Sequence, residues 1–392
     1  MINQAALALG TKRNTIMELA DYGRQRAAIV GRENVFDFSI GNPSVPTPEA
    51  VNAAIVDIIQ NMDSLAVHGY TSTLGDPKTR AAIAADLCAR FGCSAKAEDL
   101  LLCCGAAPEV SAACKALTTP GAEILVFAPY FPEYKPYIEQ AGAIFRVVPP
   151  DVPGFQIDFH ALAEIINPNT SAVIVNNPNN PVGTVYSEET IRHLAQLLDE
   201  KSREYGHRIY VIADEPYREL VYDGAVVPFI PNIYPHTVVC YSYSKSLSLP
   251  GERMGYIYVP AEAEASRDVY HAIVGAARAM GHVCAPSLMQ LVLARTAHLQ
   301  PDLTVYDRNR RTLAEALTAY GYEIARPDGA FYLFLKAPGG DDRAFSQKAL
   351  EKDLLLMPGS DFGCPGWFRV CYCVSYDTVV RSLPLFEALI KE

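Results

Sequence analysis

Short apolar runs alternate with helical stretches along much of this chain, and that alternation restricts its possible folds more than any other feature. The runs are too short for most helices and rich in β-branched or aromatic residues: Leu100 to Cys104, Ile124 to Phe127, Ile144 to Val148, Ala172 to Val175, Ile209 to Ala213 and Val238 to Tyr241. Helical patterns precede or separate them, at Thr15 to Ile29, Pro48 to Gln60, Lys78 to Arg90 and Glu188 to Tyr205. Such runs indicate strands buried on both faces. The sequence therefore predicts an α/β fold with a mainly parallel, mixed sheet covered by helices on both faces.

The residues directly after these predicted strands suggest where a ligand binds. Glycine, aromatic, amide, acidic and hydroxyl residues follow the runs, at Gly105 to Ala107, Pro129 to Phe131, NNPNNPVG, Asp214 to Tyr217 and SYSK. In open parallel sheets, ligands bind beyond the carboxyl ends of the strands. We therefore expect these loops to converge on one cleft.

The clearest chemical signal is Lys245 in SYSKSLSLPGERMG, which stands among small hydroxyl residues just after an apolar run. Desolvation lowers the pKa of an enclosed lysine toward nucleophilic use, and such an amine can form an imine with an aldehyde. Arg253 and the nearby serines could bind a dianionic phosphate. Together these residues favour a cofactor that carries both an aldehyde and a phosphate, and pyridoxal phosphate meets that description.

Composition excludes several other classes of protein. The chain has 392 residues and a formal net charge of -11, with no long basic run, which disfavours a nucleic-acid partner. The start does not have the pattern of a signal peptide, and no apolar run reaches transmembrane length, so we expect a cytoplasmic protein with no membrane partner. The ten cysteines form no two CxxC pairs, and the eight histidines form no HxxxH or HExxH group. We expect unreactive thiols in a reducing compartment and no metal site, with zinc as the lesser alternative.

The pattern of elements changes after about Pro286. A helical region over Ser287 to Tyr320, interrupted near Pro301, precedes a predicted strand, helix and strand: Gly329 to Phe334, Phe345 to Lys352 and Phe368 to Val374. That order is typical of an α+β unit. We therefore expect an N-terminal arm and part of a small domain over 1–46, a large cofactor-binding domain over 47–285, and a small C-terminal domain over 286–392.

Taken together, the motifs resemble those of the fold type I, class I/II pyridoxal-phosphate aminotransferases, the aspartate aminotransferase superfamily. The resemblance extends from IGNPSVPTPE to PGWFRV, with the motifs in the family's order and approximate spacing. It implies transamination of an L-amino acid with a 2-oxo acid acceptor. The implied route is ping-pong, through internal and external aldimines, a ketimine and pyridoxamine phosphate.

The resemblance also implies roles for individual residues. Lys245 matches the imine-forming lysine, which then carries a proton between Cα and C4′. Asp214 in ADEPY matches the aspartate that pairs with the pyridine nitrogen and keeps the ring protonated. Tyr217 and Asn180 match residues that hydrogen-bond the 3′ oxygen of the cofactor, and Asn180 is also a candidate for substrate binding.

For the phosphate, the resemblance implies a cation, two hydroxyls and the amides of a helix start: Arg253, Ser242, Ser244, Ala106 and Ala107. Gly105 permits close approach of the backbone. Many family members carry a hydroxyl residue beside that glycine, whereas this chain has Ala106, Ala107 and Pro108. We therefore expect one side-chain hydrogen bond to the phosphate to be missing.

Other matches concern the cofactor ring and the substrate. Phe131 in APYFPEY matches the aromatic that stacks on the ring, with Tyr130 and Tyr134 as alternatives. Arg369 in WFRVCY matches the arginine that binds the substrate α-carboxylate through a bidentate fork, and Gly41 is a further candidate for substrate binding.

One match involves a second subunit. Tyr70 in HGYTSTLGDP matches a tyrosine that reaches the phosphate of the neighbouring subunit, which implies a homodimer with a shared active site. Arg278 in AARAMGH lies where some family members place a cation for a second carboxylate, but it equally fits a helix surface. Aspartate, aromatic and aliphatic amino acids all stay open as substrates.

Three other functions compete with transamination. A C–S β-lyase on the same scaffold uses the same cofactor motifs, so the sequence does not separate the two. A non-catalytic regulator usually carries an added DNA-binding domain, and this chain has no basic N-terminal region for one. A nicotinamide dehydrogenase lacks support because no GxGxxG opens the first strand–helix turn.

Overall fold

The computed structural model describes residues 1–11 and 14–392, and its main feature is a seven-stranded mixed sheet. In spatial order the strands are β2 (Leu100–Cys103), β8 (Gly255–Tyr258), β7 (Thr237–Ser242), β6 (Tyr210–Asp214), β5 (Thr170–Asn176), β3 (Glu123–Phe127) and β4 (Ile144–Val148). Only β8 runs against its neighbours, β2 and β7, so the carboxyl ends of the other six strands share one edge. The predicted fold class is confirmed.

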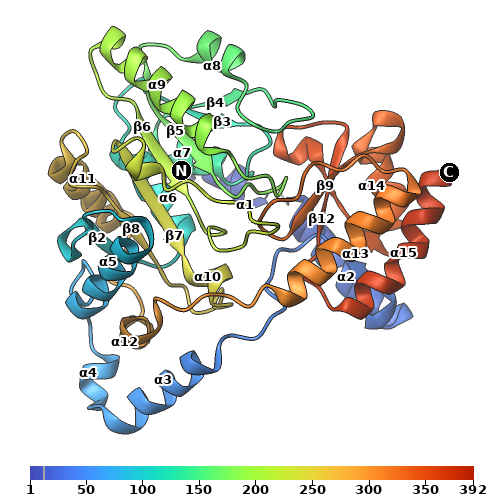
Figure 1. Cartoon of the computed structure of the whole chain (residues 1–392), viewed down its shortest axis with the longest axis horizontal. Coiled ribbons are helices and arrows are strands. Elements are labelled where there is room, and N and C mark those ends of the chain that lie inside the picture. Colours follow the sequence, from blue (N-terminus) through green and yellow to red (C-terminus); the bar gives the residue numbers. More distant parts are fainter. Residues whose placement is uncertain (12–13) are drawn as a thin grey trace.

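Successive side chains of these strands enter two separate cores, one on each face. Val211 and Ala213 join the core beneath α5 (Pro77–Phe91), α8 (Phe159–Ile165), α9 (Glu188–Tyr205) and α12 (Ser287–Thr296). Tyr210 and Ile212 join the core beneath α6 (Ala106–Ala116), α7 (Tyr134–Ala141) and α11 (Ser266–Ala279). Figure 1 shows the helices around this sheet. Burial on both faces explains why the strands other than the edge strand β4 read as apolar runs, whereas β4 is largely exposed.

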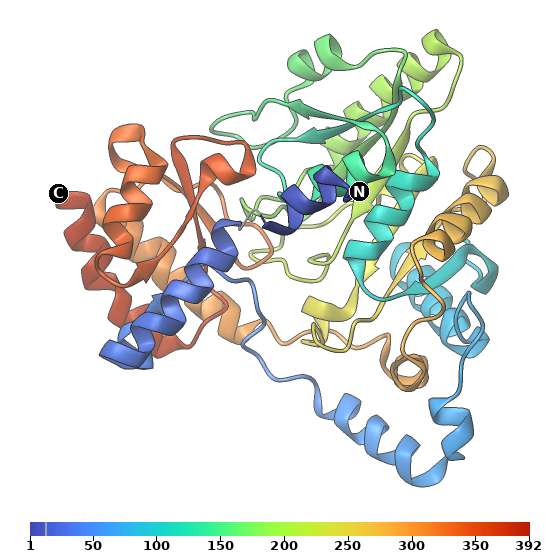
Figure 2. The same cartoon turned by 180° about the vertical axis from the view of Figure 1, so that it is seen from behind.

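A second body contains the three-stranded antiparallel sheet β11 (Met357–Pro358), β12 (Trp367–Cys371) and β9 (Tyr332–Lys336). Its helices are α2 (Thr15–Val30), α13 (Thr304–Tyr320), α14 (Asp342–Leu350) and α15 (Tyr376–Lys391). The short β1 (Phe36–Asp37) pairs in parallel with β10 (Leu354–Leu355), which ties the N-terminal segment to the C-terminal one. Figure 2 shows α2 lying against this small body.

The helix α12 differs from the predicted domain division. It packs against α3 (Glu49–Asn61) and α5, and Met289, Val292 and Leu293 join the core of the large body, although the sequence placed 286–392 in the small domain. The apolar face of α12 packs against α3 and α5. The sequence of α12 predicts an apolar face but does not specify which helices cover it. The rest of the proposed division stays a prediction.

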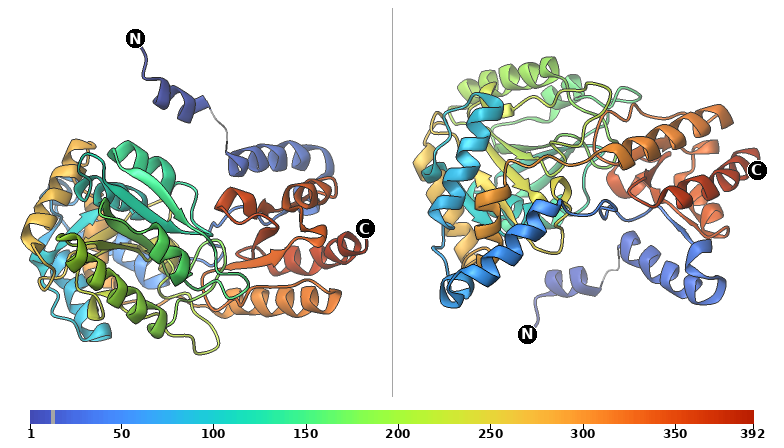
Figure 3. Two further views of the ribbon diagram at one scale, coloured as in Figure 1. Left: turned by 90° about the horizontal axis from the view of Figure 1, so that it is seen from above. Right: turned by 60° about the horizontal axis from the view of Figure 1, so that its bottom comes forward.

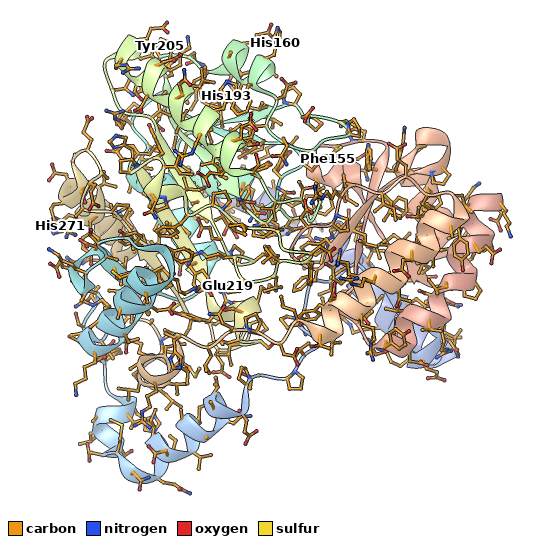
Figure 4. The ribbon with its side chains drawn as sticks, viewed as in Figure 1. Phe155, His160, His193, Tyr205, Glu219 and His271 are labelled. Atoms are coloured by element: carbon orange, nitrogen blue, oxygen red, sulfur yellow. The ribbon has the colours of Figure 1, made fainter. Side chains whose placement is uncertain are left out.

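Phe155 lies where the two bodies meet, as the stick view in Figure 4 shows. Its ring centroid is 4.9 Å from that of Trp367 and 5.6 Å from that of Phe334, both in the small body. Aromatic edges packed in this way fix the orientation of a contact as well as burying area. A loop of the large body is thereby anchored to the small one.

Two further helices, α4 and α1, belong to the N-terminal part of the described chain. The helix α4 (Ser64–His68) follows α3 at the edge of the large body. At the N-terminus, α1 (Gln4–Thr11) has no buried residue and stands apart from the rest of the chain in Figure 3. Among the described residues, no helix is long and apolar enough to cross a membrane.

Candidate active site

A cavity of about 330 Å³ lies at the carboxyl ends of the parallel strands, between the two bodies. The loops after β2, β3, β5, β6 and β7 all contribute to its wall, as the sequence predicted. Twelve of the predicted site residues line it: Gly41, Ala106, Ala107, Phe131, Asn180, Asp214, Tyr217, Ser242, Ser244, Lys245, Arg253 and Arg369. The fold therefore gathers these residues, which are far apart in the sequence, around one space.

Lys245 enters the cavity from α10 (Tyr243–Ser246), a single turn directly after β7. Its Nζ donates to the main-chain oxygen of Gly41 at 2.6 Å, a contact that spans the two bodies. Burial lowers the pKa of Lys245, and the cations Arg253 and Arg369 lower it further, although nearby thiols oppose them. The amine is thus held in place and biased toward its nucleophilic form.

Asp214, the last residue of β6, carries an incompletely paired carboxyl group. Its Oδ2 accepts a hydrogen bond from the Tyr134 hydroxyl at 2.5 Å and a longer one from Asn176 at 3.4 Å. Its Oδ1 is buried and has no hydrogen-bond partner among the described residues. Burial raises the pKa of Asp214 to about 7, against the opposing effect of the Tyr134 hydrogen bond. A protonated ring nitrogen would supply the missing donor.

The end of the cavity near α6 is suited to an anion. Arg253 has a positive φ of 54°, and its Nη1 and Nη2 donate to the main-chain oxygens of Pro250 and Cys104, each at 2.9 Å. Gly105 caps α6 with φ 90°, and a Cβ there would lie 2.8 Å from Arg253 Nη2. The first amides of α6 lack partners within the helix, so the helix start and the guanidinium together favour a phosphate.

Two serines border this same end. The Ser242 and Ser244 hydroxyls lie 2.6 Å apart, and Ser242 caps α10 by accepting from the Ser244 amide. Both residues are buried and line the cavity. Beside Gly105, Ala106 and Ala107 line the cavity with methyl groups and backbone, so neither offers a side-chain hydroxyl.

Arg369 brings β12 of the small body into the site. Its Nη1 donates to Asn180 Oδ1 at 2.9 Å, and its Nη2 donates to the main-chain oxygen of Ser39 at 2.5 Å. Its Nε is buried without a hydrogen-bond partner in the described part of the chain. A buried guanidinium with an unused donor is a suitable partner for a carboxylate.

The aromatic residues of the site separate into two groups. Phe131 and Tyr134 line the cavity, whereas Tyr130 packs edge-on against Phe145 outside it, which removes Tyr130 from the three ring-stacking candidates. The Tyr217 hydroxyl lies in the cavity wall, 2.8 Å from the Tyr332 hydroxyl. Tyr217 therefore has a hydroxyl partner that the sequence did not indicate.

Several residues of the cavity wall were not predicted from the sequence: Ile16, Ser39, Ile40, Val110, Tyr137, Asn176, Pro216, Pro250 and Tyr332. Asn176 had the strongest signal, because it opens NNPNNPVG at the end of β5. Tyr332 lies in a segment that reads as an ordinary strand, and nothing in its sequence indicates a site.

Tyr70, Gly105 and Arg278 are not in the cavity wall of their own chain. Gly105 lies directly behind it, beneath Arg253. Tyr70 is 92% exposed in the segment between α4 and α5, and Arg278 is exposed in the last turn of α11. The roles expected for Tyr70 and Arg278 both need a second subunit, so a single chain does not test them.

The site residues fit pyridoxal phosphate in three separate places. Lys245 offers an amine to an aldehyde, Asp214 Oδ1 lacks a donor that a pyridinium could provide, and Arg253 with the start of α6 offers a cradle for phosphate. Within the described residues, no group of three or more His, Cys, Asp or Glu residues is placed to hold a metal ion, and all ten cysteines are free.

Comparison with known proteins gives the same picture. A family model described as "Aminotransferase class I and II" matches residues 33–383. The chain is 28% identical to a probable N-acetyl-LL-diaminopimelate aminotransferase of Bacillus subtilis, over 92% of this chain and 91% of that one. It is 29% identical to an aspartate aminotransferase of Thermotoga maritima, over 93% of each.

Solved structures extend the likeness to the whole fold. An amino transferase from Eubacterium rectale superimposes with a TM-score of 0.98 at 51% identity, covering 100% of this chain and 98% of that one. Aspartate aminotransferase from Thermus thermophilus with maleate superimposes with a TM-score of 0.85 at 25% identity, covering 99% of each chain. Both bodies and the cavity between them therefore lie within the shared fold.

Proposed function

Because this chain belongs to the class I and II aminotransferase family, we propose that it transfers the amino group of an L-amino acid to a 2-oxo acid with pyridoxal 5′-phosphate as cofactor. The supporting observation is the convergence of Lys245, Asp214 and Arg253 on one cavity from three different loops. These residues offer an amine, a carboxyl group and a guanidinium, which suit the aldehyde, ring nitrogen and phosphate of a single molecule. Amino donor and oxo acid acceptor use the same cavity in turn, in a ping-pong cycle.

Lys245 is the residue we assign to proton transfer. When bound, pyridoxal phosphate serves as a sink for the electron pair left at the substrate α-carbon. Lys245 Nζ holds the cofactor before substrate arrives and takes the proton from the α-carbon afterwards. Its lowered pKa supports this role, because a general base needs a free lone pair near neutral pH.

Asp214, Tyr217 and Asn180 position and polarise the cofactor ring in this proposal. Asp214 holds a proton on the ring nitrogen through its unpaired Oδ1. Tyr217 and Asn180 face the same cavity and are the candidates for the 3′ oxygen, with the flat face of Phe131 against the ring.

The substrate carboxylate is assigned to Arg369, with Asn180 and Gly41 beside it. The chemistry of this end requires an α-carboxylate but does not specify a side chain. The relatives carry different names, among them aspartate, aspartate/prephenate and tyrosine aminotransferase. We therefore propose L-amino acids as the substrate class and leave the side chain to a panel of donors.

We also propose a homodimer in which Tyr70 completes the phosphate site of its partner. Tyr70 is 92% exposed, which suits a residue that acts outside its own chain. The cytoplasmic location stays a prediction from the sequence.

Replacement of Lys245 tests the proposed function directly. We expect purified protein incubated with pyridoxal phosphate to show a visible absorbance band that borohydride removes. Lys245→Ala should lack that band and lose transamination by several orders of magnitude, because the amine that holds the cofactor and moves the proton is gone. The matched control is Lys336→Ala, at a 53% exposed lysine paired with Glu323, which should behave as the parent protein.

The same protein decides between transamination and elimination. Incubation with a panel of amino donors and 2-oxoglutarate should yield the matching oxo acids and glutamate. Pyruvate and ammonia released from cysteine conjugates without any oxo acid would instead identify a β-lyase.

A visible absorbance band that persists in Lys245→Ala would contradict the assignment of Lys245 as the amine that holds the cofactor.

A further inference from the structure

Glu109 is a buried acid that the proposed reaction does not use. It lies in the first turns of α6, is 0% exposed, and neither carboxyl oxygen has a hydrogen-bond partner within the described residues. Its neighbours Ala106, Ala107 and Val110 line the cavity, but Glu109 itself does not. A carboxyl group buried in this way is costly when ionised, so its placement calls for a physical reason.

The carboxyl group of Glu109 lies behind the anion-binding end of the cavity. A Cβ added at Gly255 on β8 would overlap both Glu109 Oε1 and the main-chain oxygen of Tyr241, and it would lie 3.1 Å from the Cα of Gly105. Gly105 in turn lies beneath the Arg253 guanidinium. Glu109 and Arg253 are thus separated by little more than the glycine backbone that begins α6.

Several ionisable groups surround Glu109. Asp214 faces it from β6, Arg253 from the loop before β8, and thiols face it from the neighbouring strands and the end of β2: Cys103, Cys104 and Cys240. Burial raises the pKa of each of these thiols, so they are neutral near pH 7. The Tyr241 main chain borders the same space and its hydroxyl is neutral too, because burial raises its pKa well above the usual value. Among these groups, Asp214 and Arg253 are therefore the two whose charges affect the ionisation of Glu109.

The environment of Glu109 favours its neutral form. Burial raises the pKa of Glu109 well above its usual value, and the nearby Asp214 carboxylate raises it further, against the opposing effects of the Tyr241 main chain and Arg253. The Tyr241 main chain and the Arg253 charge would favour an ionised Glu109, but less than its burial and the second carboxylate beside it oppose that form.

Resting on the proposed function, we propose that the proton on Glu109 controls cofactor binding: the neutral acid tolerates a phosphate dianion at the start of α6, and the ionised acid repels it. Loss of that proton places a negative charge behind the cradle formed by Arg253 and the helix start. The same charge disfavours the Asp214 carboxylate that the ring nitrogen needs. Glu109 acts in this proposal as a positioning residue and does not touch the substrate.

Cofactor binding as a function of pH tests the proposal. The dissociation constant of pyridoxal phosphate is measured by absorbance between about pH 7 and pH 9.5 for the parent protein and for Glu109→Gln. We expect affinity to fall with rising pH in the parent by about tenfold more than in Glu109→Gln, because a glutamine keeps the shape and cannot ionise. The pH dependence that both proteins share belongs to Lys245 and to the cofactor itself.

A matched control separates this effect from the loss of any buried acid. Glu123 is 4% exposed at the amino end of β3, the opposite edge of the sheet, where it pairs with Arg146. Glu123→Gln should keep the parent's pH dependence of cofactor binding. If Glu123→Gln removes this pH dependence as Glu109→Gln does, the effect is not specific to Glu109 and the proposal is wrong.

Two measurements without cofactor test the proton itself. The infrared carbonyl stretch of a protonated carboxyl group should be present in the parent near pH 7 and reduced in Glu109→Gln. A native acid with a raised pKa binds more protons than its unfolded form, so the parent should lose stability as pH rises above about 4.3, more than Glu109→Gln does. Thermal unfolding at several pH values measures that difference and also shows whether the variant folds.

The possible outcomes distinguish this inference from the proposed function. A parent protein that binds no pyridoxal phosphate at pH 7 overturns the proposed function. A parent that binds it with the same pH dependence as Glu109→Gln, or a Glu109→Gln protein whose infrared spectrum keeps the full carboxyl band, overturns the role of Glu109 alone.

Discussion

At the scale of single residues, the ionisation of Asp214 depends on one hydroxyl group. The hydrogen bond from Tyr134 favours the charged carboxylate, whereas burial favours the neutral acid and raises the pKa of Asp214 to about 7. A carboxylate is the form that can pair with a protonated ring. Tyr134 therefore helps to set the ionisation of the acid that the motif displays.

Tyr134→Phe should make Asp214 harder to ionise. Loss of the hydrogen bond raises the pKa of Asp214 further, so the acid keeps its proton to higher pH. We expect the acidic limb of the pH profile of kcat/KM to move to higher pH, and the rate near pH 6 to fall several-fold. Tyr130→Phe, at the neighbouring tyrosine that packs on Phe145 outside the cavity, should leave the limb in place. An unchanged limb in Tyr134→Phe would contradict this account of Asp214.

At the scale of elements, the join between β2 and α6 has to satisfy two conditions. Gly105 adopts φ 90°, a conformation that costs about 1 kcal/mol or more for other residues. Its missing side chain also leaves room for Arg253 to reach the main-chain oxygen of Cys104. The turn therefore starts the helix and places the cation at its positive end.

Gly105→Ala should lower the stability of the protein, and it should also weaken cofactor binding. The added Cβ lies 2.8 Å from Arg253 Nη2, so the guanidinium has to move away from the start of α6. We expect the dissociation constant for pyridoxal phosphate to rise tenfold or more in an absorbance titration. The control is Gly92→Ala, at the end of α5, where φ is 66° and no described atom lies within 4 Å of the new Cβ. That variant should lose about 1 kcal/mol of stability and keep its affinity.

At the scale of the whole molecule, one region presents unusually exposed apolar side chains. Val56 and Ile59 on α3, Leu65 on α4 and Tyr70 just beyond are 53%, 49%, 84% and 92% exposed. Figure 1 shows α3 and α4 together at the edge of the large body. Apolar surface of this kind is typical of a contact between subunits.

Leu65→Glu should shift the proposed homodimer toward monomer. A charge at the centre of an apolar contact has to be desolvated, which opposes association. We expect sedimentation velocity to show a smaller species at micromolar concentration, and cofactor affinity to fall with it because Tyr70 no longer reaches the partner's phosphate site. Val226→Glu, at a 77% exposed valine in the large body, is the control and should stay dimeric. A monomeric parent protein with full cofactor affinity would refute the shared site.

The sequence by itself determined the elements and the chemistry at their ends. Runs buried on both faces must be apolar throughout, so β2, β3, β5, β6 and β7 could be recognised without knowing their neighbours. Asp214 stands at the end of one strand, and Asn180 and Lys245 follow the ends of two others. Because these strand ends share one edge of the sheet, the three residues indicated one cleft. The strand β8 was not predicted, because GYIY, four residues that begin with a glycine, has no pattern that shows direction or pairing.

Only the tertiary structure decided which side chains meet. The partner of Arg369 is Asn180, 189 positions away, and the tyrosine paired with Asp214 lies 80 positions before it. In the sequence Glu109 looks like an ordinary helix residue. Only the structure shows that its carboxyl group is buried against β7 and β8. Local pattern encodes how much of a residue is buried, whereas hydrogen bonds and pKa shifts depend on the groups that packing brings within a few ångströms.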